Sequence, residues 1–209
     1  MMDKETPIVV INRAEWSIPC ISIDWLKLIL QRDWDLRDFL VIKKGSTCKE
    51  SVYIRPCKKE MLSLIDRLYL AEGCTLYLRK IENYDPSFFK FKTELEKEFP
   101  NCAIQLNAFF TPPWSCALTA HADDHDLLAI QIAGKKKWSF WRPLYEVACK
   151  GLDAHQISVL SMEHAGNFSE EQEHVLEAGS YFFMGKGTIH KAQCFDEPSI
   201  HVSVWLEYD

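Results

Sequence analysis

The sequence lacks several features that would assign it to a special class of protein. It contains no internal repeat, no low-complexity segment and no Cys-x-x-Cys pair, although it has eight cysteines. Cysteines scattered in this way through a chain of 209 residues are typical of reduced thiols in a cytosolic protein. The segment from Met1 to Glu5 has no apolar signal-peptide core, and no apolar run approaches the length of a membrane span. We therefore expect a cytoplasmic protein that does not associate with a membrane.

Long basic segments are also absent. The longest basic run is Lys135-Lys136-Lys137, and the net charge of the chain is −6. A surface that binds duplex DNA normally carries a stripe of Lys and Arg, so the sequence gives no signal for direct DNA binding. The hydrophobic fraction of 47% and the charged fraction of 26% are those of ordinary globular proteins. A chain of this length suffices for one domain with a substantial core.

We expect this single domain to cover residues 1–209, with two halves that differ in texture. Residues 1–100 mix helices with short strands, whereas residues 101–209 are mostly strand and turn. The helices are predicted from apolar periodicity and from capping residues. They are expected at Trp25–Arg32, with Asp24 as N-cap or first-turn acid, at Lys59–Glu72, ended by Gly73, and from Asp85-Pro86-Ser87 to just before Pro100.

The expected strands dominate the second half of the chain. Aromatic residues make up 12% of the sequence, which suits a β-rich core. Gly134 and the adjacent lysines are expected to form a turn between two strands. The simplest architecture is mainly β, with N-terminal helices packed outside an antiparallel barrel. The expected strands are Ile8–Ile11, Val41–Ile42, Val52–Arg55, Leu76–Ile81, Ile104–Phe110, Leu127–Ala133, Lys137–Trp141, Ile157–Leu160, Tyr181–Met184, Ile189–Cys194 and Ile200–Leu206.

His121-Ala122-Asp123 is the first group of residues that indicates chemistry. In a strand, residues i and i+2 point to the same face, roughly 7 Å apart, so the imidazole and the carboxylate can bind one ion. The third ligand must come from elsewhere, and His190, which follows a glycine-bearing turn, is the best candidate. Two His and one carboxylate that leave the other positions of the metal open are typical of non-haem Fe(II) oxygenases.

Other interpretations of these residues stay open at this point. His-x-Asp is a short pattern that also fits a surface turn, and an isolated histidine such as His190 is more often structural. Lys136 can lie in a solvated turn, as three consecutive lysines usually do. It can equally point into a barrel, where its buried ammonium would need an anionic partner such as a dicarboxylate co-substrate.

A wider pattern surrounds these residues. It runs from Asn107-Ala-Phe-Phe-Thr-Pro-Pro113 through His121-Ala-Asp123 to Gln131-Ile-Ala-Gly-Lys-Lys136-Lys-Trp138, and it continues at Gly187-Thr-Ile-His190 and His201-Val-Ser-Val. This pattern resembles the ribosomal-oxygenase branch of the JmjC/cupin family, and the resemblance covers roughly residues 100–205. It implies a double-stranded β-helix with helices outside the barrel.

The resemblance also implies roles for individual residues. His121, Asp123 and His190 would bind Fe(II) and form the catalytic centre. Lys136 would pair with the distal carboxylate of 2-oxoglutarate, and Asn107 would line the co-substrate pocket. The implied reaction converts 2-oxoglutarate and O₂ into succinate and CO₂ and hydroxylates the substrate.

The sequence departs from the family pattern at four places. Phe109 stands where the family often has Tyr, and Ala122 replaces the usual aromatic residue between His and Asp. Cys116-Ala117 replaces Gln-Gly, and Gly185 replaces a common Pro. None of these changes removes a predicted ligand, but together they leave the substrate class open.

Nearby residues suggest other functions that fit less well. His121 and His125 are four apart, as in zinc proteases, but that motif requires a helix and a Glu after the first His, where this chain has Ala122. His125, Asp124 and Asp126 are then loop residues at the barrel mouth, where a substrate contact is an alternative.

A second set of side chains flanks the predicted site in the sequence. Cys116 and Cys194 are small buried hydrophobes, or alternatively redox groups. Trp114, Trp138, Trp141 and Trp205 are assigned to the core, although Trp114, in its Pro-Pro-Trp loop, can alternatively be exposed at a substrate groove. His201 is either a donor near the metal or part of the barrel wall.

The sequence therefore predicts an Fe(II)- and 2-oxoglutarate-dependent dioxygenase that hydroxylates an amino-acid side chain of a protein or peptide. A free amino acid or another small metabolite is the alternative substrate. The alternative from another class is a non-catalytic cupin that binds a ligand or a metal. Nothing in the sequence indicates the oligomeric state.

Overall fold

A computed structural model describes residues 10–13, 16–44, 51–54, 62, 65–118, 120–141 and 171–208. The strand expected at Ile157–Leu160 and most of the first half of the helix expected at Lys59–Glu72 lie outside these residues. The described helices are α1 (Ile23–Leu30), the π-helix η1 (Arg67–Ala71), the 3-10 helix η2 (Ile81–Asn83) and α3 (Pro86–Glu98). None of the described helices is long and apolar enough to cross a membrane.

The described strands form two antiparallel sheets. The larger sheet has the order β1-β9-β6-β11-β5-β4-β2-β3, and the smaller sheet has the order β10-β7-β8. The strands are β1 (Val10–Arg13), β2 (Phe39–Lys44), β3 (Ser51–Ile54), β4 (Thr75–Leu78), β5 (Cys102–Thr111), β6 (Asp126–Ala133), β7 (Lys135–Trp141), β8 (Gln172–Glu177), β9 (Ser180–Met184), β10 (Ile189–Cys194) and β11 (Ser199–Tyr208).

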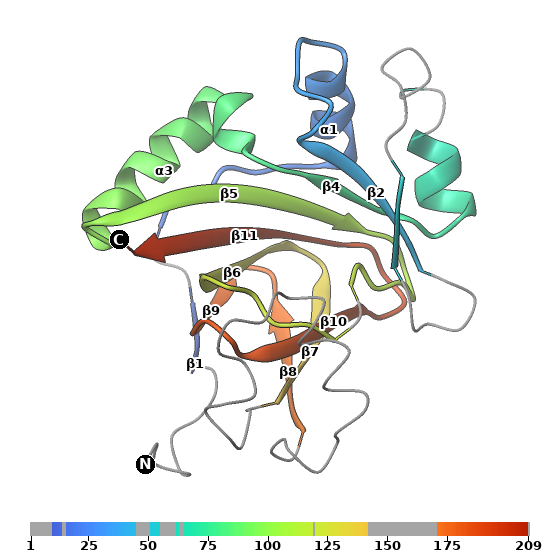
Figure 1. Ribbon diagram of the computed structural model, residues 1–209. Helices are drawn as coiled ribbons and strands as arrows, with labels where there is room; N and C mark the ends of the chain where they lie inside the picture. The colour runs from blue at the N-terminus through green and yellow to red at the C-terminus, as the bar shows by residue number, and fades with distance from the viewer. Residues whose placement is uncertain are drawn as a thin grey trace.

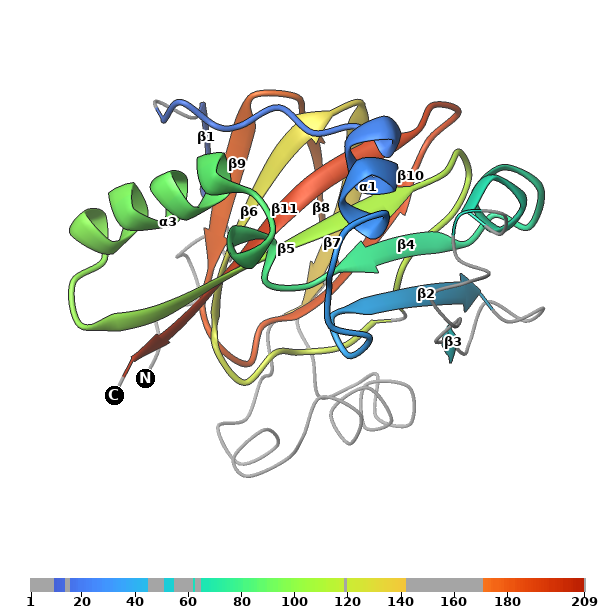
Figure 2. The same ribbon diagram turned by 90° about the horizontal axis from the view of Figure 1, so that it is seen from above.

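The two sheets lie face to face and the helices lie on one side of them. Figure 1 shows α1 and α3 above β4 and β5, on the outer face of the larger sheet, while β7, β8 and β10 lie on its opposite side. In the view from above, the long strands β5 and β11 run side by side beneath the two helices (Figure 2). This mainly β arrangement confirms the predicted double-stranded β-helix with N-terminal helices packed outside it.

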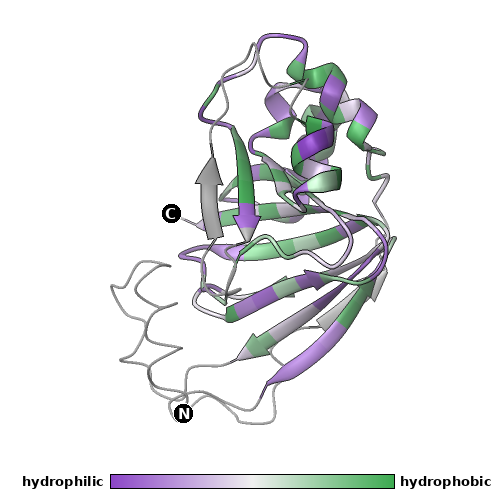
Figure 3. Cartoon of the chain, turned by 90° about the vertical axis from the view of Figure 1, so that its right-hand side faces the viewer, coloured by the Kyte–Doolittle hydropathy of each residue, from purple (hydrophilic) through white to green (hydrophobic). Residues whose placement is uncertain are grey.

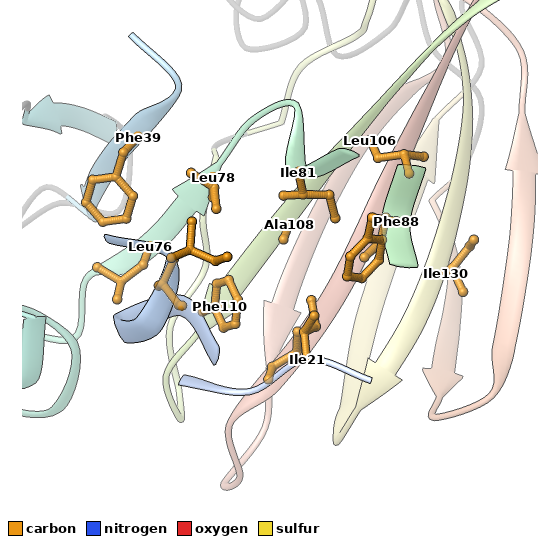
Figure 4. Packing of buried hydrophobic residues seen from close by; sticks show 14 of the residues in the cluster. Ile21, Phe39, Leu76, Leu78, Ile81, Phe88, Leu106, Ala108, Phe110 and Ile130 are labelled. Carbon is orange, nitrogen blue, oxygen red and sulfur yellow. The ribbon is translucent and has the colours of Figure 1, made fainter. Parts of the chain in front are cut away.

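The two faces of the larger sheet bury different kinds of side chain. Successive residues of a strand point to opposite faces, so hydrophobic and hydrophilic residues alternate along several strands (Figure 3). Even-numbered residues of β5 and β11, such as Phe110 and Val204, belong to the apolar cluster beneath the helices. Odd-numbered residues, such as Asn107 and His201, point to the opposite face, between the sheets. The apolar cluster is shown in Figure 4, where Leu76, Leu106, Phe110 and Ile130 of the sheet meet Ile21 and Phe88.

Several predicted helix boundaries are confirmed. Asp85 is the N-cap of α3, where its carboxylate accepts from the Ser87 N–H at 2.8 Å, and Pro86 occupies the first helical position. The first helix begins after Ser22, which is its N-cap, so Asp24 is the first-turn acid. Gly73 ends the second helix with a φ of +65°.

Other predictions were wrong in detail. The strand predicted at Leu76–Ile81 ends at Leu78, because Lys80 adopts a left-handed conformation and η2 follows directly. Gly134 alone makes the turn between β6 and β7, and the three lysines belong to β7. β8 was missed, because its charged and polar residues show little of the apolar alternation that identifies a strand.

The close approach at Gly134 allows a test of the turn. Gly134 has a φ of +64°, and a Cβ there would collide with the backbone carbonyl of Pro198. We expect Gly134→Ala to lower the free energy of unfolding by about 3 kcal/mol or more, since the backbone must shift as well as bear the strain. At Gly179, φ is +84° but a Cβ would meet no atom within 4 Å, so Gly179→Ala should cost only about 1 kcal/mol. Urea unfolding measures both, and equal losses would contradict the predicted collision.

Candidate metal centre

Two segments far apart in the sequence bring the predicted ligands together. His121 and His190 form an isolated antiparallel bridge, with N···O distances of 3.1 and 2.8 Å between their backbones. The prediction that residues 121–123 lie in a regular strand was wrong, since this bridge is the only strand-like pairing described for them. The backbone carbonyl of Asp123 instead accepts from Gly187 N–H at 2.9 Å, which ties the segment to the glycine turn before β10.

The three side chains converge on one point. His121 Nε2 lies 3.8 Å from Asp123 Oδ1, and His190 Nε2 lies 3.6 Å from Asp123 Oδ2. One ligand atom from each of the three residues lies within 4.8 Å of the others. Ligand atoms about 2 Å from a common ion would be separated by distances close to these. Two imidazoles and one carboxylate are the donor set of non-haem iron sites, so the residues present fit such a metal.

His190 is held in the form that binds metals. Its ring is buried, and Nδ1 donates to the carbonyl oxygen of Thr188 at 3.0 Å, which leaves the lone pair of Nε2 facing the other two ligands. Burial, and then repulsion by His121, lowers the pKa of His190 to about 4. The ring is therefore neutral at pH 7, and a neutral imidazole is the form that coordinates a metal.

A cavity of about 330 Å³ opens beside the three ligands. It lies between the two sheets, and most of its walls are apolar or aromatic. Such a space suits a small molecule that is held by a few polar groups. The residues that line it are Leu40, Tyr77, Arg79, Phe109, Ala117, Leu118, His121, Asp123, Leu127, Trp138, His190, Ala192, His201, Ser203 and Trp205.

Lys136 lies behind the wall of this cavity and not in a solvated turn. Its side chain is buried, and Nζ donates to Thr111 Oγ1 at 3.0 Å and to His201 Nδ1 at 2.8 Å. Burial lowers its pKa to about 8, and the nearby thiols of Cys194 and Cys116 oppose this shift. In the described part of the chain, no carboxylate pairs with it.

His201 connects Lys136 to the cavity. The ring stacks on Phe109, with centroids 4.7 Å apart and planes 3° from parallel. Burial, and then the charge of Lys136, lowers its pKa well below the usual value, so the ring is neutral. Because an ammonium group only donates, Nδ1 accepts from Lys136 and the ring proton lies on Nε2. Thr111, the other acceptor for Lys136, was named at the sequence level only as part of the family pattern.

Asn107 is near the site but does not line the cavity. It is fully buried on β5, where Oδ1 accepts from Gln105 Nε2 at 2.7 Å and from Lys80 N–H at 3.4 Å. Its Nδ2 atom has no hydrogen-bond partner among the described residues. The predicted contact of Asn107 with a co-substrate stays a prediction.

The other singled-out residues lie in varied places. The thiols of Cys116 and Cys194 are buried close to Lys136. The assignment of Trp114 to the core was wrong, since the residue is 68% exposed; it does not line the cavity either. His125 donates through Nδ1 to Asp124 at 3.0 Å, and Asp126 is the first residue of β6.

The end of the cavity formed by Arg79 and Trp205 was missed at the sequence level. Trp205 had been assigned to the core, but it is only half-buried and lines the cavity. The sequence did contain a signal for Trp205 at the cavity, because His201, Ser203 and Trp205 alternate along β11 and therefore share one face. Arg79 carried no signal, since it follows the end of β4 and belongs to no motif.

The fold and these side chains define a β-barrel protein with a candidate two-histidine, one-carboxylate metal site. The chain belongs to the JmjC domain family, whose model matches residues 78–209.

Two relatives show the extent of the likeness in sequence. The bifunctional lysine-specific demethylase and histidyl-hydroxylase NO66 of Drosophila mojavensis is 30% identical over 139 residues, which cover 64% of this chain and 14% of that protein. Ribosomal oxygenase 1 of Rattus norvegicus is 30% identical over 144 residues, which cover 66% of this chain and 22% of that protein. The chain thus spans less than a quarter of the length of these two relatives.

Solved structures show the same fold. A structure of Escherichia coli YcfD has a TM-score of 0.70 at 16% identity, covering 96% of this chain and 50% of that chain. A structure of YcfD, described as a ribosomal oxygenase, in complex with cobalt and 2-oxoglutarate has a TM-score of 0.65 at 15% identity, covering 96% and 48%.

The buried ammonium of Lys136 predicts an unusual dependence of stability on pH. Folding lowers its pKa from 10.5 to about 8, so the unfolded chain holds this proton more tightly between those values. The contribution of Lys136 to the free energy of unfolding should therefore rise by about 3 kcal/mol as the pH increases from below 8 to above 10.5.

A substitution isolates this contribution. Lys136→Met removes the charge, so it should stabilise the metal-free protein at pH 7 by about 1–3 kcal/mol, with little gain above pH 10.5. Urea unfolding at several pH values measures this, with Lys137→Met as the control, because Lys137 pairs with Glu173 at the surface. A Lys136→Met protein less stable than the wild type at pH 7 would show that the ammonium contributes more through its hydrogen bonds than burial costs.

Proposed function

We propose that this chain is an Fe(II)- and 2-oxoglutarate-dependent oxygenase that hydroxylates an amino-acid side chain of a protein or peptide. The observation that carries the proposal is the convergence of His121, Asp123 and His190 beside a cavity. Behind its wall lies a buried lysine, Lys136, that pairs with no carboxylate among the described residues. Relatives described as a histidyl-hydroxylase and as a ribosomal oxygenase support the reaction class.

The roles of the residues follow from their chemistry. His121, Asp123 and His190 would hold Fe(II), and bound iron with 2-oxoglutarate supplies the chemistry that hydroxylates a C–H bond. Lys136 would bind the distal carboxylate of 2-oxoglutarate, since a buried ammonium with no described carboxylate partner favours an anion. The complex of YcfD with cobalt and 2-oxoglutarate supports this pair of ligands.

The protein prepares the site for both ligands before they arrive. The Thr188 carbonyl orients His190, and Lys136 sets the tautomer of His201, whose Nε2–H is then a donor beside the co-substrate. Tyr77 and Phe109 stack with their ring centroids 4.1 Å apart and form part of the apolar wall of the cavity. Electrostatic contacts to a bound anion are stronger beside apolar walls than in water.

A protein or peptide is the proposed partner, and a free amino acid is the second candidate. We also propose a cytoplasmic location, which is supported by the scattered free cysteines of the sequence.

Anaerobic titration tests the metal and co-substrate assignments together. Fe(II) and then 2-oxoglutarate are added to the apo-protein while the weak visible charge-transfer band is monitored. We expect the band in the wild type and its loss in His121→Ala, because one of the three ligands is removed. His174→Ala is the matched control, since His174 lies on β8 outside the cavity lining and should leave the band unchanged.

The outcomes separate the competing functions. A wild-type protein that shows no band does not bind iron and 2-oxoglutarate as proposed. A protein that shows the band but forms no succinate from 2-oxoglutarate with O₂ and ascorbate is a binding module and not an oxygenase.

The role of Lys136 is tested by the affinity for 2-oxoglutarate. Lys136→Ala leaves a carboxylate unpaired in a dry pocket, and loss of one partner of a buried pair costs about 3–5 kcal/mol. The dissociation constant should therefore increase roughly a hundredfold or more. Calorimetry on the metal-bound protein measures it, with Lys137→Ala as the surface control. An affinity close to that of the wild type would remove Lys136 from this role.

A further inference from the structure

The cavity has two polar ends, and only one of them is assigned by the proposed function. His201, Ser203 and Trp205 share the inner face of β11, and two residues of a strand span roughly 7 Å. His201 and Trp205 are therefore about 13 Å apart along the strand. Lys136 contacts His201 at one end, whereas Arg79 contacts Trp205 at the other.

Arg79 brings a positive charge to this second end. Its guanidinium carbon lies 5.5 Å from the centre of the Trp205 ring, in a cation–π arrangement. Among the described residues, its buried Nε atom has no hydrogen-bond partner and its side chain forms no ion pair. A buried donor without a partner costs free energy, which a ligand that accepts from it would recover.

Asp38 contacts the backbone of Arg79, but its carboxylate is engaged by other residues. The backbone N–H of Arg79 donates to the carbonyl oxygen of Asp38 at 2.7 Å, which fixes the start of the side chain. The Asp38 carboxylate, however, accepts from Tyr84 Oη at 2.7 Å and lies 3.8 Å from Lys80 Nζ. The backbone of Arg79 is thus anchored, while no carboxylate in the described part of the chain pairs with its guanidinium.

The charges of the cavity favour an anion at this end. Asp123 is the only carboxylate among the described residues that line the cavity, and it belongs to the metal centre. A cationic side chain would meet Arg79 with no second carboxylate to balance it. A carboxylate would instead gain charge-assisted hydrogen bonds from a planar guanidinium that matches its shape.

The indole ring of Trp205 positions the guanidinium group of Arg79. His125 packs on the ring in a tilted arrangement, with centroids 4.3 Å apart and planes 34° from parallel, and Arg79 also contacts the ring. His125 lies two residues from the metal-ligand candidate Asp123 in the sequence. The contact between His125 and Trp205 therefore connects the second end of the cavity to the metal centre. A group held by Arg79 would therefore lie across the cavity from the co-substrate end.

We propose that the substrate presents a side-chain carboxylate to Arg79, either from an acidic residue of a peptide or from a free acidic amino acid. The inference rests on the proposed function, since it names the substrate class of the same site. Arg79 would be a specificity-determining residue that selects a carboxylate over the corresponding amide.

Binding measurements on the loaded protein test this selection. The probes are short blocked alanine peptides with Glu, Gln, Asp, Asn, His or Arg at the centre, and free glutamate, glutamine, aspartate and asparagine. Each is titrated by calorimetry into the anaerobic protein with Fe(II) and saturating 2-oxoglutarate, so that the probes cannot occupy the co-substrate site. We expect an acidic probe to bind about 10- to 100-fold more tightly than its amide, as for one charge-assisted contact.

Substitutions of Arg79 and of the neighbouring Lys80 test whether Arg79 causes the preference for the acid over the amide. Arg79→Gln should abolish the preference for the acid while leaving the charge-transfer band and the affinity for 2-oxoglutarate unchanged. Arg79→Lys should restore part of it. Lys80→Gln is the matched control, because it removes a positive charge from the next residue, outside the cavity lining, and should keep the full preference. Binding of peptides or of free acids identifies the source of the carboxylate.

Several results would overturn the inference. These are equal binding of acid and amide, binding of no carboxylate probe, tighter binding of the His or Arg peptide, or an undiminished preference in Arg79→Gln. A loss of 2-oxoglutarate affinity in Arg79→Gln with no change in probe selection would make Arg79 a co-substrate residue instead. Absence of the charge-transfer band in the wild type would defeat the proposed function itself, whereas a normal band with no acid preference defeats only this inference.

Discussion

The antiparallel pairing of β11 with both β5 and β6 is the constraint on which the core and the site depend. Because the period of a strand is two residues, this pairing commits alternate side chains of β11 to opposite faces. Val202 and Val204 enter the apolar cluster beneath the helices, while His201 and Trp205 line the cavity. A shift of the register by one residue would bury polar groups among the helices and place valines at the cavity. The packing of the helices therefore maintains the register of the functional residues.

The cavity side of the barrel contains groups that lower stability. Lys136 is buried with a depressed pKa, and Arg79 has a buried nitrogen without a partner. Each of these groups would cost less if it were replaced by an apolar side chain. The apolar face offsets the cost, since each fully buried Leu or Phe contributes about 1.5–3 kcal/mol. Because β5 and β11 direct alternate side chains to opposite faces, one sheet supports a stable apolar core on one face. Its other face carries the costly polar groups of the site.

Sequence patterns predicted the elements whose signals are local. The capping pair Asp85-Pro86 and the alternation along β11 defined their elements, and the spacing of His121, Asp123 and His190 directed attention to the residues that converge. The patterns were ambiguous or silent where tertiary contacts decide the conformation. The run of lysines left both a surface turn and a barrel interior open for Lys136, and its side chain is buried where β7 pairs with β8 and β10. Arg79 belongs to no motif, because it reaches the cavity only through the pairing of β4 with β5.

One departure from the family pattern, Phe109, changes which side chains make this cavity polar. Phe109 lacks the hydroxyl of the usual tyrosine, and its ring is instead sandwiched between Tyr77 and His201. This end of the cavity therefore depends on Lys136 and His201 for its polarity. The other end is defined by a cation on an indole ring. Positive charge at both ends, with the metal ligands between them, makes the space complementary to anions at each end. A cavity of about 330 Å³ with this distribution of charge suits two small acidic ligands that meet beside the metal centre.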